Sequence, residues 1–255
     1  MTVRRKLVAG NWKMVASRGP LDELKAVNDA AGRLDVDVAL CPPFPLIGPA
    51  RDAAPQLEVG GQDCHHLAQG PHTGSTSPAL LRDFGAAYVI VGHSERRALG
   101  ETDAQVSAKA AAAVCAGLIP IICVGESAEE RRQGDAAALI SHQVCASLPA
   151  AVMPDRMVIA YEPIWAIGSG RTPNSLEIAE MHSAIRASLL RSYGPSAAEM
   201  RILYGGSVSP HNAGWISAIE GVDGLLVGAC SLNAVDFVPI IEAAAAVGQP
   251  VPAAA

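Results

Sequence analysis

The sequence predicts an α/β fold in which eight parallel strands, each followed by a helix, close into a single (β/α)8 barrel. Eight short apolar runs recur along the 255 residues, and each ends in glycine, proline or a polar residue. The runs are continuously apolar rather than alternating, which is typical of parallel strands buried on both faces. The intervals between the runs carry helical signals. Eight strand–helix units in about 250 residues match a closed barrel.

The eight predicted strands are spread over the whole chain. The weakest is the third, because Glu58 lies inside it and two glycines end it. In order they are LVAG (7–10), VALCPP (38–43), LEVGG (57–61), YVIVG (88–92), PIICVG (120–125), MVIAY (157–161), RILYGG (201–206) and GLLVG (224–228).

The clearest predicted helix spans 174–193. Asn174 can cap its first turn with Glu177 as the reciprocal partner, and Gly194 followed by proline ends it. Its apolar positions step along one face at helical spacing: Ile178, Met181, Ile185 and Leu189. A second helix is predicted over 102–116, and the Ala-rich tail, 242–255, is expected to fray at its two prolines.

An open doubly wound sheet is the alternative fold. It usually shows a G-x-G-x-x-G turn after its first strand, whereas here Asn11-Trp12-Lys13 follows and no such fingerprint occurs elsewhere. No linker or shift in composition divides the chain. We therefore expect one domain, 1–255.

Composition excludes several classes of partner. The net charge is −6 with no basic patch, which argues against nucleic acid. The first apolar run is too short for a signal peptide, and none approaches a membrane span. The six cysteines never form C-x-x-C, so we expect reduced, buried thiols in a cytoplasmic protein rather than disulfides or a zinc site.

Polar residues follow most of the predicted strands. The carboxyl ends of all strands open on one face of a parallel barrel, where active sites lie. These residues can therefore be taken as one constellation: Asn11 and Lys13 after the first strand, His93, Ser94 and Glu95 after the fourth, Cys123 in the fifth, Glu162 after the sixth, Ser207 after the seventh, and Gly228 and Ala229 after the eighth.

Each of these side chains also has an ordinary interpretation. Lys13 alone would be a solvated surface lysine, His93 a hydrogen-bonded histidine at a strand end, and Glu162 the partner of an arginine. Cys123 is expected to be a core residue rather than a nucleophile, because no base lies near it in sequence. The pair at 65–66, two histidines without a spaced third ligand, is expected to be a surface loop.

Glycine turns after the late strands favour a phosphorylated ligand. GSG (168–170), GGS (205–207) and GA (228–229) expose backbone N–H groups, which bind phosphate without a positive side chain. A carboxylate, a histidine and a lysine facing such a cradle suit proton transfer beside a carbonyl. No metal set and no nucleotide motif accompanies them, so we expect no cofactor and no metal.

Five motifs in order resemble the triosephosphate isomerase family. The likeness runs from about residue 4 to about residue 245, nearly the whole chain. The motifs are AGNWKM (9–14), VGHSERR (91–97), AYEPIWAIGSG (160–170), YGGSV (204–208) and DGLLVGACSL (223–232).

The resemblance implies a TIM barrel that interconverts D-glyceraldehyde 3-phosphate and dihydroxyacetone phosphate without a cofactor. Glu162 would be the base that moves the proton between two carbons, and His93 the neutral electrophile. Lys13 would stabilise the enediolate, Asn11 would orient the substrate, and Glu95 would lie behind Lys13.

The resemblance also implies a phosphate site and a closing loop. Backbone N–H groups of Gly168, Ser207, Gly228 and Ala229 would hold the phosphate. The segment 163–172 resembles the family's lid, and its closure would exclude water from the enediolate.

A homodimer is implied as well. In the family the loop 70–78 enters a second subunit, with Thr73 near the partner's Asn11 and Lys13. Ser75 stands where an acidic residue is usual, so this loop departs from the family pattern.

Other departures leave a related isomerase for a tetrulose phosphate open. They are Ala229 in place of glycine, Arg171 in place of the common lysine, and the sequence at 15–17. A barrel that binds a sugar phosphate without catalysis is a second alternative, which the presence of Lys13, His93 and Glu162 opposes. Metal-dependent hydrolysis is a third, and it lacks paired ligands at strand ends.

Overall fold

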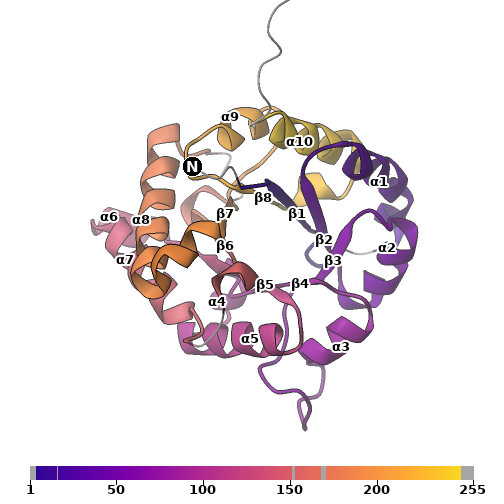
Figure 1. The fold of residues 1–255 in the computed structure, drawn as a ribbon, viewed down its shortest axis with the longest axis horizontal. Coiled ribbons are helices and arrows are strands. Elements are labelled where there is room, and N and C mark those ends of the chain that lie inside the picture. Colours follow the sequence, from indigo (N-terminus) through magenta and orange to yellow (C-terminus); the bar gives the residue numbers. More distant parts are fainter. Residues whose placement is uncertain (1–3, 16, 151–152, 168–170, 248–255) are drawn as a thin grey trace, which may run out of the picture.

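Eight parallel strands form one closed barrel in sequence order, with helices around the outside (Figure 1). The computed structural model describes residues 4–15, 17–150, 153–167 and 171–247. β1 pairs with both β2 and β8, which closes the barrel and confirms the predicted fold. The strands are β1 (Leu7–Asn11), β2 (Asp37–Cys41), β3 (Glu58–Gly61), β4 (Tyr88–Val91), β5 (Ile119–Val124), β6 (Val158–Tyr161), β7 (Arg201–Tyr204) and β8 (Gly224–Val227).

Every strand is followed by helical structure, as expected from the sequence intervals. Two of the helices, α4 and α6, are short additional turns before the main helix of their unit. The helices are α1 (Leu24–Arg33), α2 (Ile47–Ala53), α3 (Pro78–Asp83), α4 (Ser94–Arg97), α5 (Asp103–Cys115), α6 (Ala128–Arg132), α7 (Ala136–Ser147), α8 (Ser175–Tyr193), α9 (Ala213–Ser217) and α10 (Ala234–Ala246).

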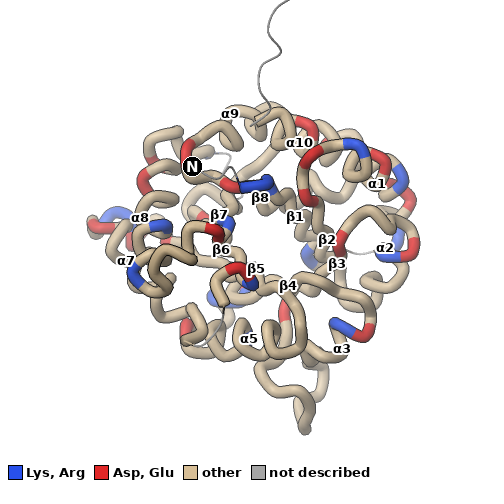
Figure 2. The backbone as a smooth tube through the Cα atoms, viewed as in Figure 1, with Lys and Arg blue, Asp and Glu red and all other residues tan. Residues whose placement is uncertain are grey.

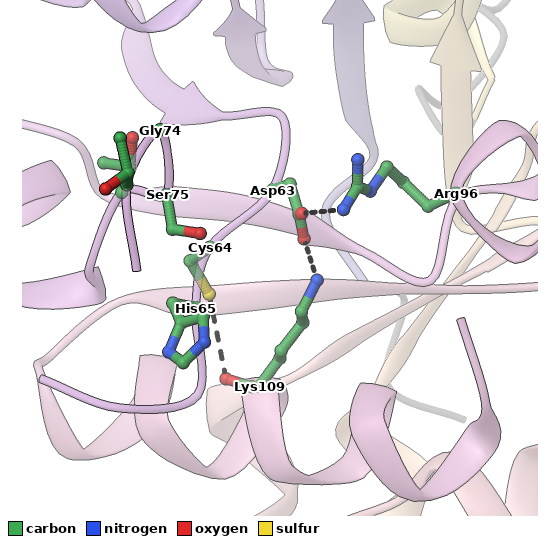
Figure 3. Close-up of a pocket in the computed structure, with 9 residues that line it drawn as sticks. Asp63, Cys64, His65, Gly74, Ser75, Arg96 and Lys109 are labelled. Atoms are coloured by element: carbon green, nitrogen blue, oxygen red, sulfur yellow. Dashed lines mark hydrogen bonds and ion pairs between the residues drawn. The ribbon is translucent and has the colours of Figure 1, made fainter. Parts of the chain in front are cut away.

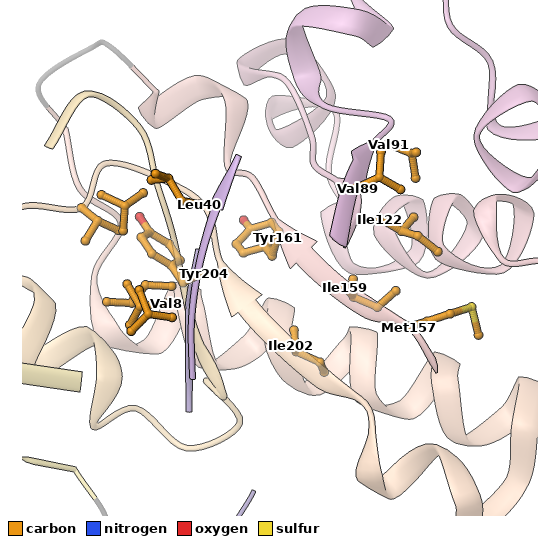
Figure 4. Close-up of a cluster of buried hydrophobic side chains, with 14 of the residues drawn as sticks. Val8, Leu40, Val89, Val91, Ile122, Met157, Ile159, Tyr161, Ile202 and Tyr204 are labelled. Atoms are coloured by element: carbon orange, nitrogen blue, oxygen red, sulfur yellow. The ribbon is translucent and has the colours of Figure 1, made fainter. Parts of the chain in front are cut away.

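The strands separate two layers of buried side chains. Leu7 and Ala9 of β1 pack inside the barrel, whereas Val8 between them belongs to the layer under the helices. Figure 4 shows part of this outer layer, including Ile159 and Tyr161 of β6. Burial on both faces explains why the strands are continuously apolar.

The predicted capping of α8 by Asn174 and Glu177 is confirmed. The side chain of Asn174 accepts from the backbone N–H of Glu177, and the Glu177 side chain accepts from the backbone of Asn174. The predicted apolar face of α8 is fully buried. Thr102 caps α5 in the same way, with Gln105 as its partner. These local bonds fix where both helices begin.

β3 shows why the weakest apolar run still forms a strand. A Cβ on Gly60 would lie 2.8 Å from the sulfur of Cys41 and 2.9 Å from the backbone oxygen of Tyr88. Glycine therefore lets β2 and β4 approach β3 closely. Glu58, the residue that weakened the pattern, is exposed at the start of the strand.

The expected burial of the cysteines is only partly correct, and the expected fraying of the tail concerns residues that the structure does not describe. Cys41, Cys64 and Cys123 are buried as expected, but Cys230 is only half-buried, and Cys115 and Cys145 are exposed. Both exposed cysteines lie on Ala-rich helices without a clear apolar face, so the sequence pattern does not say which side is outward. The expected fraying concerns 248–255, outside the described residues.

Charged residues of both signs are interspersed along the outer helices (Figure 2). Within the described ranges, no helix combines the length and hydropathy that crossing a membrane requires.

Candidate active site

Five of the predicted residues line one small cavity at the carboxyl ends of the strands. They are Asn11, Lys13, His93, Glu162 and Gly228. The cavity measures about 50 Å³ and is completed by Ile167, Gly205, Gly206 and Leu226. Segments from β1, β4, β6, β7 and β8 therefore meet here, as parallel strand ends in a barrel must.

Glu162 and His93 face each other in this cavity. Glu162 follows β6 directly, is 2% exposed, and its backbone N–H donates to the carbonyl of Val124. One carboxylate oxygen lies 2.9 Å from Nε2 of His93, and the other accepts from the backbone N–H of Ser94 at 2.9 Å. This N–H belongs to the first residue of the short helix α4 (Ser94–Arg97).

His93 is held in one tautomer by its neighbours. Its Nδ1 accepts from the backbone N–H of Glu95 at 3.2 Å, which leaves the proton of a neutral ring on Nε2. That proton points at Glu162. The ring is thus placed as a neutral hydrogen-bond donor into the cavity.

Lys13 occupies an unusual backbone position. Its φ is 51°, in the left-handed region that costs a non-glycine residue about 1–3 kcal/mol. Its backbone N–H donates to the side chain of Asn11, and its carbonyl accepts from Gln62 at 2.8 Å. Its ammonium lies 2.7 Å from Glu95, although the two residues are far apart in sequence. This places Glu95 where the resemblance put it.

The carboxylate of Glu95 is anchored by that ammonium. Partial burial raises its pKa, and the hydrogen bond and charge of Lys13 outweigh this effect, so that the pKa is lowered overall. Glu95 stays ionised as the counter-charge of Lys13.

The backbone around Glu162 is tightly constrained. A Cβ on Gly125, at the end of β5, would lie 1.8 Å from the backbone oxygen of Glu162. Only glycine permits this approach. The carboxylate is therefore held by the packing of two neighbouring strands as well as by its own hydrogen bonds.

The residues predicted to bind phosphate do not all line the cavity. Gly228 lines the cavity, and the exposed Ala229 follows it at the start of a 3-10 turn, η6 (Ala229–Ser231). Ser207 is half-buried, and its hydroxyl donates to the carbonyl of Ala166 at 3.1 Å. Gly168 lies outside the described residues.

The structure also bears on the structural interpretations of Glu162 as the partner of an arginine and of Cys123 as a core residue. Glu162 bonds to His93 and Ser94, and no ion pair joins it to an arginine among the residues described. Cys123 is buried inside the barrel, and burial together with the charge of Glu162 raises its pKa well above the usual range, which makes it a core thiol.

The loop interpretation of the neighbouring histidines is confirmed. His65 and His66 lie in a loop, with their rings stacked at 4.5 Å. Across the described ranges, no three His, Cys, Asp or Glu side chains are arranged to hold a metal ion.

Sequence reasoning missed Gln62 and Glu126, and it placed Ile167 only within the predicted lid segment 163–172. Gln62 secures the carbonyl of Lys13, but glutamine after an apolar run carries no distinctive signal. Buried Glu126 receives the indole N–H of Trp165 at 2.8 Å. Ile167 forms part of the cavity wall. Only tertiary contacts reveal these roles.

Comparisons with known proteins agree with this geometry. A family model described as triosephosphate isomerase matches residues 6–244. The triosephosphate isomerase of Ruegeria sp. (strain TM1040) is 51% identical over 95% of this chain and 99% of its own length. The triosephosphate isomerase of Xanthobacter flavus is 51% identical over 94% of this chain and 98% of its own length.

A solved structure extends the agreement to the fold. The crystal structure of triosephosphate isomerase from Bartonella henselae superposes with a TM-score of 0.87 at 39% identity. The superposition covers 94% of this chain and 98% of that one. The chain belongs to the triosephosphate isomerase family.

Proposed function

We propose that Glu162, His93 and Lys13 carry the proton transfers by which this chain interconverts D-glyceraldehyde 3-phosphate and dihydroxyacetone phosphate. The activity follows from the family. The residue roles are our assignment. The observation that supports it best is the shared cavity in which a buried carboxylate, a neutral histidine N–H and an ammonium converge.

Glu162 is the base in this scheme. Substrate entering the cavity displaces the His93 contact, and the freed carboxylate oxygen takes a proton from the carbon beside the carbonyl. The same carboxylic acid then returns the proton to the neighbouring carbon, so no proton is lost overall. General acid–base catalysis of this kind contributes roughly 10²- to 10⁴-fold.

His93 and Lys13 stabilise the negative charge that develops on the carbonyl oxygen of the substrate. His93 donates its Nε2 proton to the carbonyl oxygen and takes up the proton of the neighbouring hydroxyl oxygen, so that one oxygen gains the proton that the other loses and the ring ends neutral. The Lys13 ammonium stabilises the same negative charge. Asn11, 5% exposed, orients the substrate from the end of β1.

The phosphate end of the substrate is assigned to backbone N–H groups at Ser207, Gly228 and Ala229. The two glycines after β7 and the short 3-10 turn after β8 support the assignment. Gly168 remains a proposed fourth ligand on the resemblance alone.

Substitution of Glu162 tests the base. Glu162→Asp withdraws the carboxylate by one methylene, and we expect kcat to fall about 10²- to 10⁴-fold with the melting temperature little changed. Glu180→Asp, the same change at an exposed position of α8, is the control and should keep normal kcat. Near-normal turnover by Glu162→Asp would remove it from the mechanism.

The comparisons give no support to the tetrulose phosphate alternative. Initial rates on D-glyceraldehyde 3-phosphate and on a tetrulose phosphate, measured side by side, decide the question. We expect kcat/KM on the triose to approach about 10⁸ M⁻¹s⁻¹ and to exceed the value on the tetrulose greatly. A higher value on the tetrulose would reverse the assignment.

We also infer a homodimer formed through the loop 70–78. The loop projects from the barrel between β3 and α3 (Figure 1). At its base lies a cavity of about 460 Å³, lined in part by Asp63, Arg96 and Lys109 (Figure 3). Met14, beside Lys13, is 96% exposed. An unpartnered apolar side chain and an open cavity near the active site are what a subunit interface would cover.

Sedimentation tests the dimer. Thr73→Arg places a bulky charge on the loop tip, and we expect the protein to shift toward monomer. Ala187→Arg, at an exposed position of α8, should leave the oligomer unchanged. An unchanged dimer in Thr73→Arg would place the interface elsewhere.

A cytoplasmic location is likewise our proposal. The six cysteines are free, and two of them are exposed. Exposed free thiols are typical of a reducing compartment.

A further inference from the structure

We propose that three stacked histidines, His65, His66 and His72 (the histidine stack), hold the loop 70–78 in place, and that mild acid releases this loop by protonating them. The proposal rests on the homodimer inferred above, because that inference assigns the loop 70–78 to the subunit interface. Its consequence is that the association of two copies of this chain depends on pH.

His65 is the ring that the other two members of the histidine stack share. Its ring centroid lies 4.0 Å from that of His72 and 4.5 Å from that of His66, with the ring planes inclined by 25° and 26°. His65 precedes the loop 70–78, whereas His72 lies within it, next to Thr73. Stacking of these rings therefore ties the part of the loop assigned to the interface to the chain that enters it.

Two hydrogen bonds of His65 shape the base of the loop. Its backbone N–H donates to the carbonyl of Thr76 at 2.8 Å, which joins the two sides of the loop. Its Nδ1 accepts from the backbone N–H of Leu67 at 3.0 Å. The second bond can form only while Nδ1 carries no proton. Protonation of His65 therefore breaks a backbone bond as well as adding charge.

The charged groups around the histidine stack are already paired with one another. They come from the segment before the loop, from α4, from the turn between α4 and α5, and from α5: Asp63, Arg96, Glu101 and Lys109. Asp63 lies 3.1 Å from Arg96 and 2.6 Å from Lys109 (Figure 3), and Lys109 also pairs with Glu101. Two carboxylates thus balance two cations, and no whole negative charge is left to neutralise protonated histidines.

Glu101 offers the stack at most one further acceptor. Its second carboxylate oxygen is buried and accepts no hydrogen bond from the part of the chain that the structure describes. Glu101 lines a cavity of about 260 Å³ together with His65 and His66. A protonated ring would have to leave the stack to reach that oxygen, and two protonated rings left in the stack would repel at about 4 Å. Both routes open the stack.

The surroundings of His65 disfavour its protonated form. Desolvation lowers the pKa of His65, and positive charge on His72 and His66 lowers it further. The open loop therefore binds a proton more readily than the closed loop. The closed loop is favoured above pH of about 6.5, and this preference is lost as the pH falls below that value. Each proton taken up on opening shifts the equilibrium by up to about 10-fold per pH unit.

Hydrogen exchange tests the loop itself. We expect the backbone N–H of Leu67 to lose protection about 10-fold or more between pH of about 7.5 and pH of about 5.5, after correction for intrinsic exchange rates. His72→Phe keeps a ring in the stack but removes one charge, and His66→Phe/His72→Phe removes two, so that acid should remove progressively less protection. His142→Phe, the same change at an exposed position of α7, should match the parent.

Sedimentation over the same pH range measures the effect on association. The dissociation constant of the dimer should rise about 10-fold or more in the parent and in His142→Phe, less in His72→Phe and least in the double variant. Four of the seven histidines lie outside the stack and are shared by the parent and the stack variants. Their titration therefore cancels in the comparison.

Three results would overturn the proposal. They are exchange at Leu67 that does not depend on pH, an acid response in the double variant as large as in the parent, and a dissociation constant that stays unchanged while the loop opens. If the double variant does not fold, His72→Phe alone carries the test. Failure of the homodimer assignment has a different signature, because Thr73→Arg would then remain dimeric while exchange at Leu67 still reported the stack.

Discussion

Two buried carboxylates lie at opposite ends of the barrel and differ in what surrounds them. Glu162 follows the carboxyl end of β6, and Asp223 directly precedes β8 at the other end. Their exposures are 2% and 5%, so burial alone does not distinguish them. Their partners do.

Asp223 is saturated by permanent donors. Arg4 donates to one of its oxygens at 2.8 Å, and Arg186 and the backbone N–H of Ile202 donate to the other at 2.7 and 2.9 Å. Glu162 instead has one backbone donor and one neutral histidine that faces a cavity. A carboxylate with two arginines has no capacity left for a substrate proton, whereas one with a displaceable partner does.

The largest effect on stability should come from Asp223→Asn. It leaves Arg4 and Arg186 without their shared counter-charge, and removal of one partner from a buried pair typically costs about 3–5 kcal/mol. Urea unfolding should show this loss, while kcat of the folded protein stays near normal. Asp29→Asn, at an exposed pair with Lys25, is the control. If Asp223→Asn lowered kcat as Glu162→Asp should, the contrast between the two carboxylates would fail.

A smaller effect concerns pH and His182 of α8, at the same end as Asp223. Its Nδ1 lies 3.0 Å from the carbonyl of Gly221, and burial lowers its pKa to about 4. Below pH of about 6.5 the unfolded chain binds a proton that the folded protein excludes. Stability is therefore lost as pH falls from about 6.5 to about 4, by roughly 3 kcal/mol at most.

The measurement is the free energy of unfolding by urea across that pH range. His182→Gln keeps a donor for the Gly221 carbonyl but does not titrate, so its pH dependence should be flatter. His142→Gln, at an exposed position of α7, should match the parent. Identical slopes in all three proteins would show that His182 does not contribute.

The smallest effect on stability should come from Glu95→Gln. The Lys13–Glu95 pair is substantially exposed, and such pairs contribute about 1 kcal/mol or less. Because Lys13 loses its anchor, kcat should still fall, though less than in Glu162→Asp. Steady-state kinetics beside urea unfolding measures both. A large loss of stability with normal kcat would make Glu95 structural rather than supporting.

The fold, and the meeting of Asn11, Lys13, His93 and Glu162 in one cavity, could be predicted because both follow from local sequence. Continuous apolar runs report burial on both faces, and a parallel barrel brings the residues after them to one end. The pairing of Lys13 with Glu95 came only from the family resemblance, since nothing local links them. The left-handed backbone of Lys13 and the Glu126–Trp165 hydrogen bond have no sequence signature, because they arise from packing between distant segments.

The close approach of Gly125 to Glu162 bears on how this pocket can be redesigned. Every side chain other than hydrogen would place an atom inside the main-chain oxygen of the adjoining strand end. Position 125 is therefore closed to stepwise substitution in a library, although it lies directly beside Glu162. Randomisation is better directed at Ala229, which is exposed.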